Sequence, residues 1–287
     1  MTLPDQRARN EIMIDGQLEQ FRRNGFLLLQ DFYKVDTEIE PILEGIRVII
    51  ELMAKKHGIG GPYSTAEEAM SQCYPKLIAI NRAWGGEIYD AVKQIPEFVE
   101  LVANKRNARL FEALRPGAKS GIAGGGYGIR IDNPGEDKFR ALWHQDFSGQ
   151  LRSYDGLVLW SPLLAVTPEM GPVQIAVGSH VEGYVSTYDD NGNLGPGGSY
   201  AVRLQGEEDL LAKYETVAPL TKPGDLLVMD FLLLHQSGHN ISKTPRWSMQ
   251  LRYFNFRDPL GIKISWKGLF AAGERSANVI PNLIGAK

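Results

Sequence analysis

The spacing of apolar residues divides the chain into a helical part and a strand-rich part. Before about residue 107, apolar side chains recur every three or four positions, as in residues 39–53, and this period predicts helices. Thr65 and Glu68 have the spacing of a capping box, which predicts the start of another helix. We expect further helix over residues 75–105, with interruptions near the glycine pair at 85–86 and near Pro96.

After about residue 107 the apolar runs become short and are separated by glycine and proline, which is typical of strands in a sandwich or barrel. We therefore expect one mainly β domain with helices packed outside it: a helical region 1–107, a core 108–257 and a tail 258–287. The turn-rich residues 189–199 predict a surface loop and a candidate lid. The candidate strands are residues 128–131, 157–160, 173–177, 216–219, 226–230 and 247–256.

Composition and charge narrow the class of protein. The 287 residues carry 31 Lys+Arg against 34 Asp+Glu, and this balance argues against nucleic-acid binding by bulk charge. No apolar run approaches the roughly 20 residues of a membrane span, and the polar start has no secretory signal, so we expect a cytoplasmic protein. A single cysteine argues against a multi-cysteine metal site and leaves the five histidines as candidate ligands.

Two of these histidines have the setting of metal ligands. His144 and Asp146 are two residues apart, so on a strand they point to the same face and can reach one cation. His235 ends an apolar run and would complete a set of two histidines and one carboxylate, which is typical of non-haem Fe(II) oxygenases. His239 is an alternative to His235, but a helical His-x-x-x-His pair is opposed by Gly238 and by the strand pattern.

A third segment places polar groups along one side of a strand. Alternation puts Arg246, Ser248, Gln250 and Arg252 on a common face, which is either solvated or the wall of a pocket. The guanidinium of Arg246 can bind a carboxylate at two points, and Ser248 can add a hydroxyl to the same group.

Five segments, in this order, resemble the phytanoyl-CoA dioxygenase family of Fe(II)/2-oxoglutarate oxygenases. The first is similar to the family's F-x-x-x-G-F opening, and the fourth to its G-P-L…P-G-S-H stretch. The resemblance implies a double-stranded β-helix, a jelly-roll related to the cupins, with iron at one mouth. The segments are residues 21–29, 130–135, 143–146, Trp160 with 171–180, and 235–246.

Position by position, the resemblance implies that His144, Asp146 and His235 bind iron. Asp146 stands where related halogenases carry Ala or Gly, which favours hydroxylation over chlorination. One departure is visible, because Ala176-Val177 replaces the family's usual proline before Gly-Ser-His. That change affects a turn and not the chemistry.

The resemblance also implies a site for 2-oxoglutarate. Arg246, helped by Ser237, would bind the distal carboxylate of 2-oxoglutarate, and Ser248 is a further candidate. Trp160 and, less closely, Ile129 align with family residues that line the cosubstrate pocket.

These implications predict an Fe(II)/2-oxoglutarate-dependent dioxygenase, monomeric or homodimeric. It would use O₂ to hydroxylate a small-molecule metabolite or natural-product intermediate, with release of succinate and CO₂. Arginines near the pocket would favour an anionic or polar substrate. The candidate substrate contacts are Tyr127, Arg130, Trp143, Phe147, Arg152 and Arg252.

The alternative is a jelly-roll metal protein without oxygenase activity, such as a cupin-like isomerase or a sugar-binding module. The pair Arg246 and Ser248 favours the oxygenase, because a simple metal-binding cupin has no need for a carboxylate-binding pair beside its metal.

Overall fold

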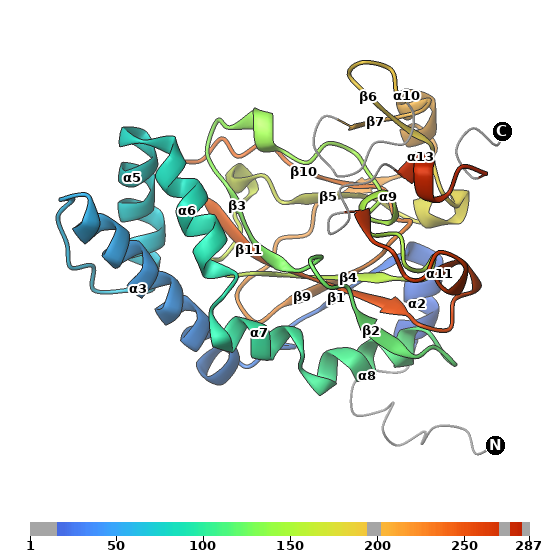
Figure 1. The fold of residues 1–287 in the computed structure, drawn as a ribbon, viewed down its shortest axis with the longest axis horizontal. Helices are drawn as coiled ribbons and strands as arrows, with labels where there is room; N and C mark the ends of the chain where they lie inside the picture. The colour runs from blue at the N-terminus through green and yellow to red at the C-terminus, as the bar shows by residue number, and fades with distance from the viewer. Residues whose placement is uncertain (1–15, 194–201, 270–275, 283–287) are drawn as a thin grey trace.

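The computed structural model describes residues 16–193, 202–269 and 276–282. An antiparallel sheet of six strands forms the centre, and a three-stranded and a two-stranded sheet accompany it (Figure 1). The central sheet contains β1 (Phe26–Leu29), β9 (Leu226–Asp230), β4 (Leu157–Pro162), β11 (Arg246–Asn255), β2 (Ser120–Ile122) and β3 (Gly128–Asp132). The smaller sheets contain β10 (His235–Ser237), β5 (Val173–Ala176) and β8 (Thr216–Val217), and β6 (Thr187–Asp189) with β7 (Val202–Leu204).

Helices account for most of the chain before β2, and short helical turns punctuate the remainder (Figure 1). The longer helices are α2 (Gln17–Asn24), α3 (Glu40–Lys56), α5 (Tyr74–Ile80), α6 (Arg82–Val92), α7 (Pro96–Val102) and α8 (Lys105–Leu114). The shorter ones are η1 (Val35–Ile39), α4 (Ala66–Glu68), η2 (Ala69–Cys73), η3 (Asp137–Phe139), α9 (Phe147–Gln150), η4 (Pro168–Met170), η5 (Ser179–Glu182), α10 (Glu207–Leu211), α11 (Pro259–Lys263) and α13 (Ser276–Val279).

The central sheet is buried on both faces, and its alternating side chains join two separate cores. Leu157 and Leu159 of β4 pack with the helices of the N-terminal region. Val158 and Trp160 point the other way and pack with Val173 and other residues around the three-stranded sheet. Because successive side chains of a strand alternate, the even-numbered face of β4 looks into the space between the two sheets.

The structure confirms a mainly β fold with flanking helices, and each of the six candidate strands coincides with an observed strand. Thr65 caps α4 as predicted, since its hydroxyl accepts a hydrogen bond from the Glu68 amide at 3.1 Å. One expectation is wrong: α6 continues through Gly85 and Gly86. The packing explains this, because a Cβ on Gly85 would press against Ile78 of α5.

Two elements lie outside the expected pattern. β1 occurs within the predicted helical region and pairs with β9, and α8 continues through Leu114 before β2 begins. Most of the candidate lid at 189–199 lies outside the described residues. None of the described helices is both long enough and apolar enough to cross a membrane.

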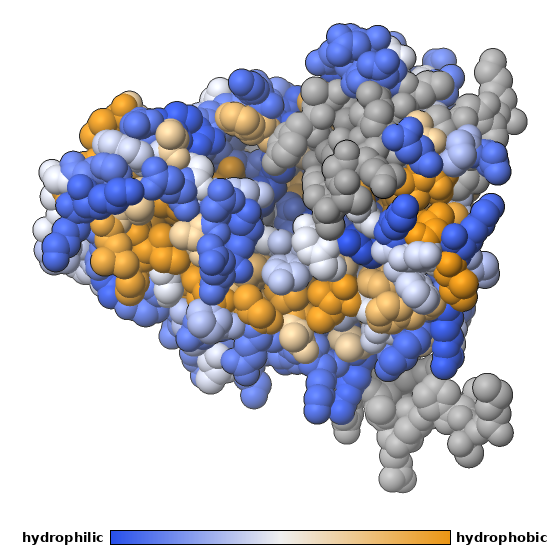
Figure 2. Space-filling model, viewed as in Figure 1, coloured by the Kyte–Doolittle hydropathy of each residue, from blue (hydrophilic) through white to orange (hydrophobic). Residues whose placement is uncertain are grey.

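Apolar surface gathers over the N-terminal helices at the left of Figure 2. Leu52 of α3 and Ile80 of α5 are largely exposed. An open groove lined by residues such as Val48 and Ile95 lies in this region. The groove shares no lining residue with the cavities described below.

Candidate metal centre and its cavities

A two-residue bridge between separate parts of the chain brings His144 and His235 together. The His144 amide donates to the His235 carbonyl at 3.0 Å, and the His235 amide donates back at 3.1 Å. Their imidazole centroids lie 4.3 Å apart. His235 opens β10, while His144 leads through Asp146 into α9, so the bridge places all three side chains at one point between the sheets.

The backbone orients both imidazoles. Nδ1 of His144 is 2.7 Å from the Leu142 carbonyl, and Nδ1 of His235 is 2.9 Å from the Leu233 carbonyl. A carbonyl only accepts, so each Nδ1 carries the hydrogen and each Nε2 keeps its lone pair for a metal. Burial lowers the pKa of His144 to about 3, helped by the nearby His235, and burial also lowers the pKa of His235. Both rings are therefore neutral at pH 7, as metal ligation requires.

Asp146 offers a third candidate ligand atom. Its carboxylate is 5% exposed, and Oδ1 accepts a hydrogen bond from Nε of Arg252 at 2.9 Å. Oδ2 has no hydrogen-bond partner and lies 3.6 Å from Nε2 of His235. Burial opposes ionisation, but the charge and hydrogen bond of Arg252 act against it, and the pKa of Asp146 lies below its usual value. An ionised, buried carboxylate oxygen without a hydrogen-bond partner is typical of a metal ligand in the absence of its ion.

The three side chains together form a donor set of two imidazole nitrogens and one carboxylate oxygen. The candidate ligand atoms all lie within 4.8 Å of one another, and all three residues are buried. Two histidines and one carboxylate are the donor set that non-haem Fe(II) enzymes use.

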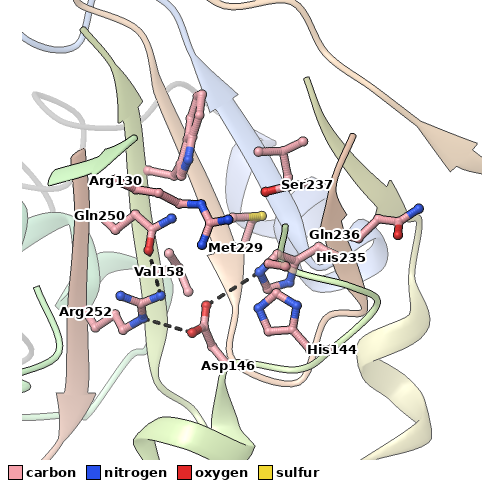
Figure 3. A pocket seen from close by; sticks show the side chains of 13 residues that line it. Arg130, His144, Asp146, Val158, Met229, His235, Gln236, Ser237, Gln250 and Arg252 are labelled. Carbon is pink, nitrogen blue, oxygen red and sulfur yellow. Dashed lines mark hydrogen bonds and ion pairs between the residues drawn. The ribbon is translucent and has the colours of Figure 1, made fainter. Parts of the chain in front are cut away.

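These candidate ligands line a cavity between the sheets (Figure 3). Strands β3, β4 and β11 contribute Arg130, Trp160 and Gln250 to its wall, and Ser237 comes from β10. The register explains the grouping, because Ser248 of β11 pairs with Arg130 and Gln250 pairs with Trp160.

The candidate cosubstrate residues occupy different depths. Ser237 and Trp160 line the cavity directly, whereas Arg246 lies one hydrogen bond behind the wall, with Nη2 3.0 Å from the Ser237 hydroxyl. The Ser248 hydroxyl is buried and has no hydrogen-bond partner. Ile129 packs with the helix-side core and borders a second cavity.

Arg246 and Arg130 share one carboxylate, that of Asp132. Nη2 of Arg246 is 2.8 Å from Asp132 Oδ2, and Nη2 of Arg130 is 2.6 Å from Oδ1. Arg246 also donates to the Gly171 carbonyl. Burial raises the pKa of Asp132, but the two guanidiniums outweigh it and hold that pKa well below its usual range. Two cations against one anion leave an excess positive charge at this end of the cavity, which suits an incoming carboxylate.

The second cavity adjoins the first and shares Arg130, Gln250 and Arg252 with it. Tyr127 lines this second cavity.

The three other candidate substrate contacts line neither cavity. Phe147 stacks on Tyr154 with centroids 4.6 Å apart, Trp143 packs in a small separate apolar cluster, and Arg152 is buried behind the second cavity.

Sequence reasoning did not single out Tyr89 and Gln150, which also line the second cavity. Gln150 follows Asp146 by four residues, one turn of α9, and that spacing is a usable signal. Tyr89 comes from α6, and no local pattern marks it.

The remaining histidines with candidate roles lie apart from the centre. Nε2 of His180 contacts the Arg22 carbonyl at 3.0 Å, and His239 is largely exposed and pairs with Asp137 at 2.9 Å. Among the described residues, His144, Asp146 and His235 form the one group of histidine, cysteine and acidic side chains close enough together to hold a metal.

Known proteins resemble this chain in sequence family and in fold. The family model for phytanoyl-CoA dioxygenase (PhyH) matches residues 21–248. No curated protein matches the chain in sequence. A structure of EctD from S. alaskensis with 2-oxoglutarate and 5-hydroxyectoine is 20% identical, with a TM-score of 0.52 over 85% of this chain and 77% of the other.

Two further structures come from nogalamycin biosynthesis. The carbocyclase SnoK is 17% identical, with a TM-score of 0.53 over 85% of each chain. The epimerase SnoN is 15% identical, with a TM-score of 0.51 over 88% of this chain and 84% of the other. These likenesses confirm the double-stranded β-helix fold.

Proposed function

Because the chain belongs to the phytanoyl-CoA dioxygenase family, we propose that it is an Fe(II)/2-oxoglutarate-dependent oxygenase that acts on a small molecule. The observation that carries the proposal is the convergence of two oriented imidazoles on the unpartnered Oδ2 of Asp146. When bound, iron with 2-oxoglutarate and O₂ supplies the oxidising chemistry, with succinate and CO₂ as co-products. Its outcome in this protein is proposed to be hydroxylation, and the presence of Asp146 as a third ligand supports oxygen over halide transfer.

The protein's own residues bind and orient the reactants. His144, Asp146 and His235 would hold the metal through Nε2, Oδ2 and Nε2. Ser237, Ser248 and the arginines that share Asp132 provide donors and positive charge for the distal carboxylate of 2-oxoglutarate.

Apolar groups limit the water that reaches the reaction. Val158, Trp160 and Met229 form part of the cavity wall around these donors and exclude solvent from it. The fold supports other outcomes too, since the structures of similar fold include a carbocyclase and an epimerase.

Anaerobic addition of Fe(II) and 2-oxoglutarate tests the proposal. The complex should develop the weak visible charge-transfer band of an iron-bound 2-oxo acid, and His144→Ala should abolish it. Exposure to air should then yield succinate. A protein that binds Fe(II) but gives neither the band nor succinate would instead fit a jelly-roll metal protein without oxygenase activity.

A further inference from the structure

The second cavity continues from the metal-lined one along a wall of linked polar groups. Nε of Arg252 holds Asp146, and its Nη1 donates to the Gly126 carbonyl at 2.9 Å. Gly126 lies against Gln150, because a Cβ on this glycine would collide with the Gln150 amide oxygen. A molecule in the second cavity is thus bounded by Arg252 near the metal ligands and by Gln150 farther along the wall.

Gln150 presents an unused hydrogen-bond donor at this wall. Its side chain is fully buried, and Nη1 of Arg152 lies 3.3 Å from Oε1. A guanidinium donates and never accepts, so Arg152 fixes the amide with Oε1 toward itself and Nε2 turned away. Nε2 has no hydrogen-bond partner. A buried amide N–H left without an acceptor is costly, and a bound ligand oxygen would remove that cost.

Arg152 carries a buried charge that no carboxylate balances within the described part of the chain. It is 6% exposed and donates to the carbonyls of Gln150 at 3.0 Å and Gly124 at 2.8 Å. Burial lowers its pKa. By contrast, Arg246 and Arg252, two other buried or largely buried arginines near the cavities, each pair with an aspartate. Buried ions are normally paired, so an unpaired one marks a place for an anion.

The backbone near Arg152 has an unusual conformation and packs closely against its side chain. Leu151 and Arg152 both have left-handed φ angles, of 50° and 54°, which non-glycine residues adopt at an energetic cost. Gly261 and Gly268 leave the room that Arg152 needs, because a Cβ on Gly261 would strike its carbonyl and one on Gly268 its guanidinium. Strain and close packing hold the guanidinium against Gln150 instead of in solvent.

We propose that the second cavity is the substrate site, and that Gln150 donates a hydrogen bond to an anionic oxygen of the substrate, a carboxylate or a phosphate ester. Arg152 is a positioning residue that fixes the Gln150 amide and supplies the positive potential behind it. This inference rests on the proposed function for the meaning of "substrate", while the anion site itself rests on Gln150 and Arg152 alone.

The substitution Gln150→Glu tests this assignment because it separates folding from binding. A glutamate at this position would pair with Arg152, so the folded state should keep its stability, but the new negative charge would repel an anion. Gln20→Glu, an exposed site on α2, makes the same charge change elsewhere and serves as the matched control.

The experiment titrates the anaerobic Fe(II) and 2-oxoglutarate complex with inorganic phosphate and, separately, with acetate, followed by calorimetry. Saturation with 2-oxoglutarate blocks the cationic end near Arg246. The wild type and Gln20→Glu should bind at least one of the two anions, and Gln150→Glu should bind it at least tenfold more weakly. The preferred anion distinguishes a phosphate ester from a carboxylate.

Equal binding by the wild type and Gln150→Glu, or binding of neither anion by the wild type, would overturn the proposal. If Gln150→Glu does not fold, Gln150→Leu, which removes the donor without adding charge, decides by the same titration. If no charge-transfer band forms but anion binding still depends on Gln150, then the proposed function fails while the anion site stands.

Discussion

The two buried histidines should make the metal-free protein sensitive to mild acid. In the folded state burial lowers the pKa of His144 to about 3, against an ordinary value of 6.5. A base with a lowered pKa binds fewer protons in the folded than in the unfolded chain. Stability is therefore complete above the unfolded pKa and is lost as the pH falls below about 6.5.

The size of the loss follows from these values. Between pH 7 and pH 5 the unfolded imidazole of His144 takes up most of a proton while the folded one stays neutral. At about 1.36 kcal/mol per pH unit below the unfolded pKa, this histidine alone removes about 2 kcal/mol of unfolding free energy. The result holds for any folded pKa below about 4. His235, whose pKa is lowered in the same direction, adds to the loss.

Urea unfolding of the metal-free protein, with a chelator present, measures this loss at the two pH values. His144→Gln should lose about 2 kcal/mol less than the wild type over the same interval. His239→Gln is the matched control because its imidazole is largely exposed, and it should behave as the wild type does. If His144→Gln and the wild type lose the same free energy, the buried neutral state assigned to His144 is wrong.

Three further predictions concern the cosubstrate, the second cavity and the helical region. Arg246→Ala should raise the 2-oxoglutarate concentration needed for the charge-transfer band far more than the Fe(II) concentration, and equal losses would contradict its role. Gly126→Ala should displace the Gln150 amide, cost about 1–3 kcal/mol in thermal unfolding and weaken anion binding, whereas unchanged binding would separate Gly126 from that site. Thr65→Ala should cost about 1 kcal/mol through the lost cap of α4, with iron binding unchanged, and a weaker iron affinity would refute that independence.

Local pattern was sufficient for much of the fold. β9 was predicted with its observed ends because five apolar and acidic residues lie between turn signals, and the cap of α4 follows from Thr65 and Glu68. β1 was not predicted because a four-residue apolar run is too short to show a period. Its strand conformation depends on pairing with β9, far along the chain. α6 crosses two glycines because tertiary packing against α5 outweighs their low helix propensity.

The site, like the fold, was predicted from the sequence only in part. Strand alternation placed Arg246 on the cavity-facing side of β11, but its depth behind Ser237 is set by Asp132, which lies opposite it on β3. Such cross-strand partners are separated by more than a hundred residues in sequence, so no local spacing reports them. The role of the Gln150 amide likewise becomes visible only in the folded structure, where it lies beside Arg152 and Gly126. Gly126 precedes β3 in the chain.

The two cavities share an excess of positive charge from the arginines around them. Among the described residues, the arginines around them are Arg130, Arg152, Arg246 and Arg252, and the buried aspartates that pair with them are Asp132 and Asp146. Four positive charges against two negative ones leave an excess of two, and the neutral histidines do not change it.

A divalent metal would add two further positive charges to this excess, and the dianion 2-oxoglutarate would remove two. The loaded site would then still carry the original excess, and buried charge of one sign is unfavourable until it is paired. A substrate with an anionic group is the partner that lowers this excess, so the electrostatics of the whole site agree with the hydrogen-bond donor left unused at Gln150.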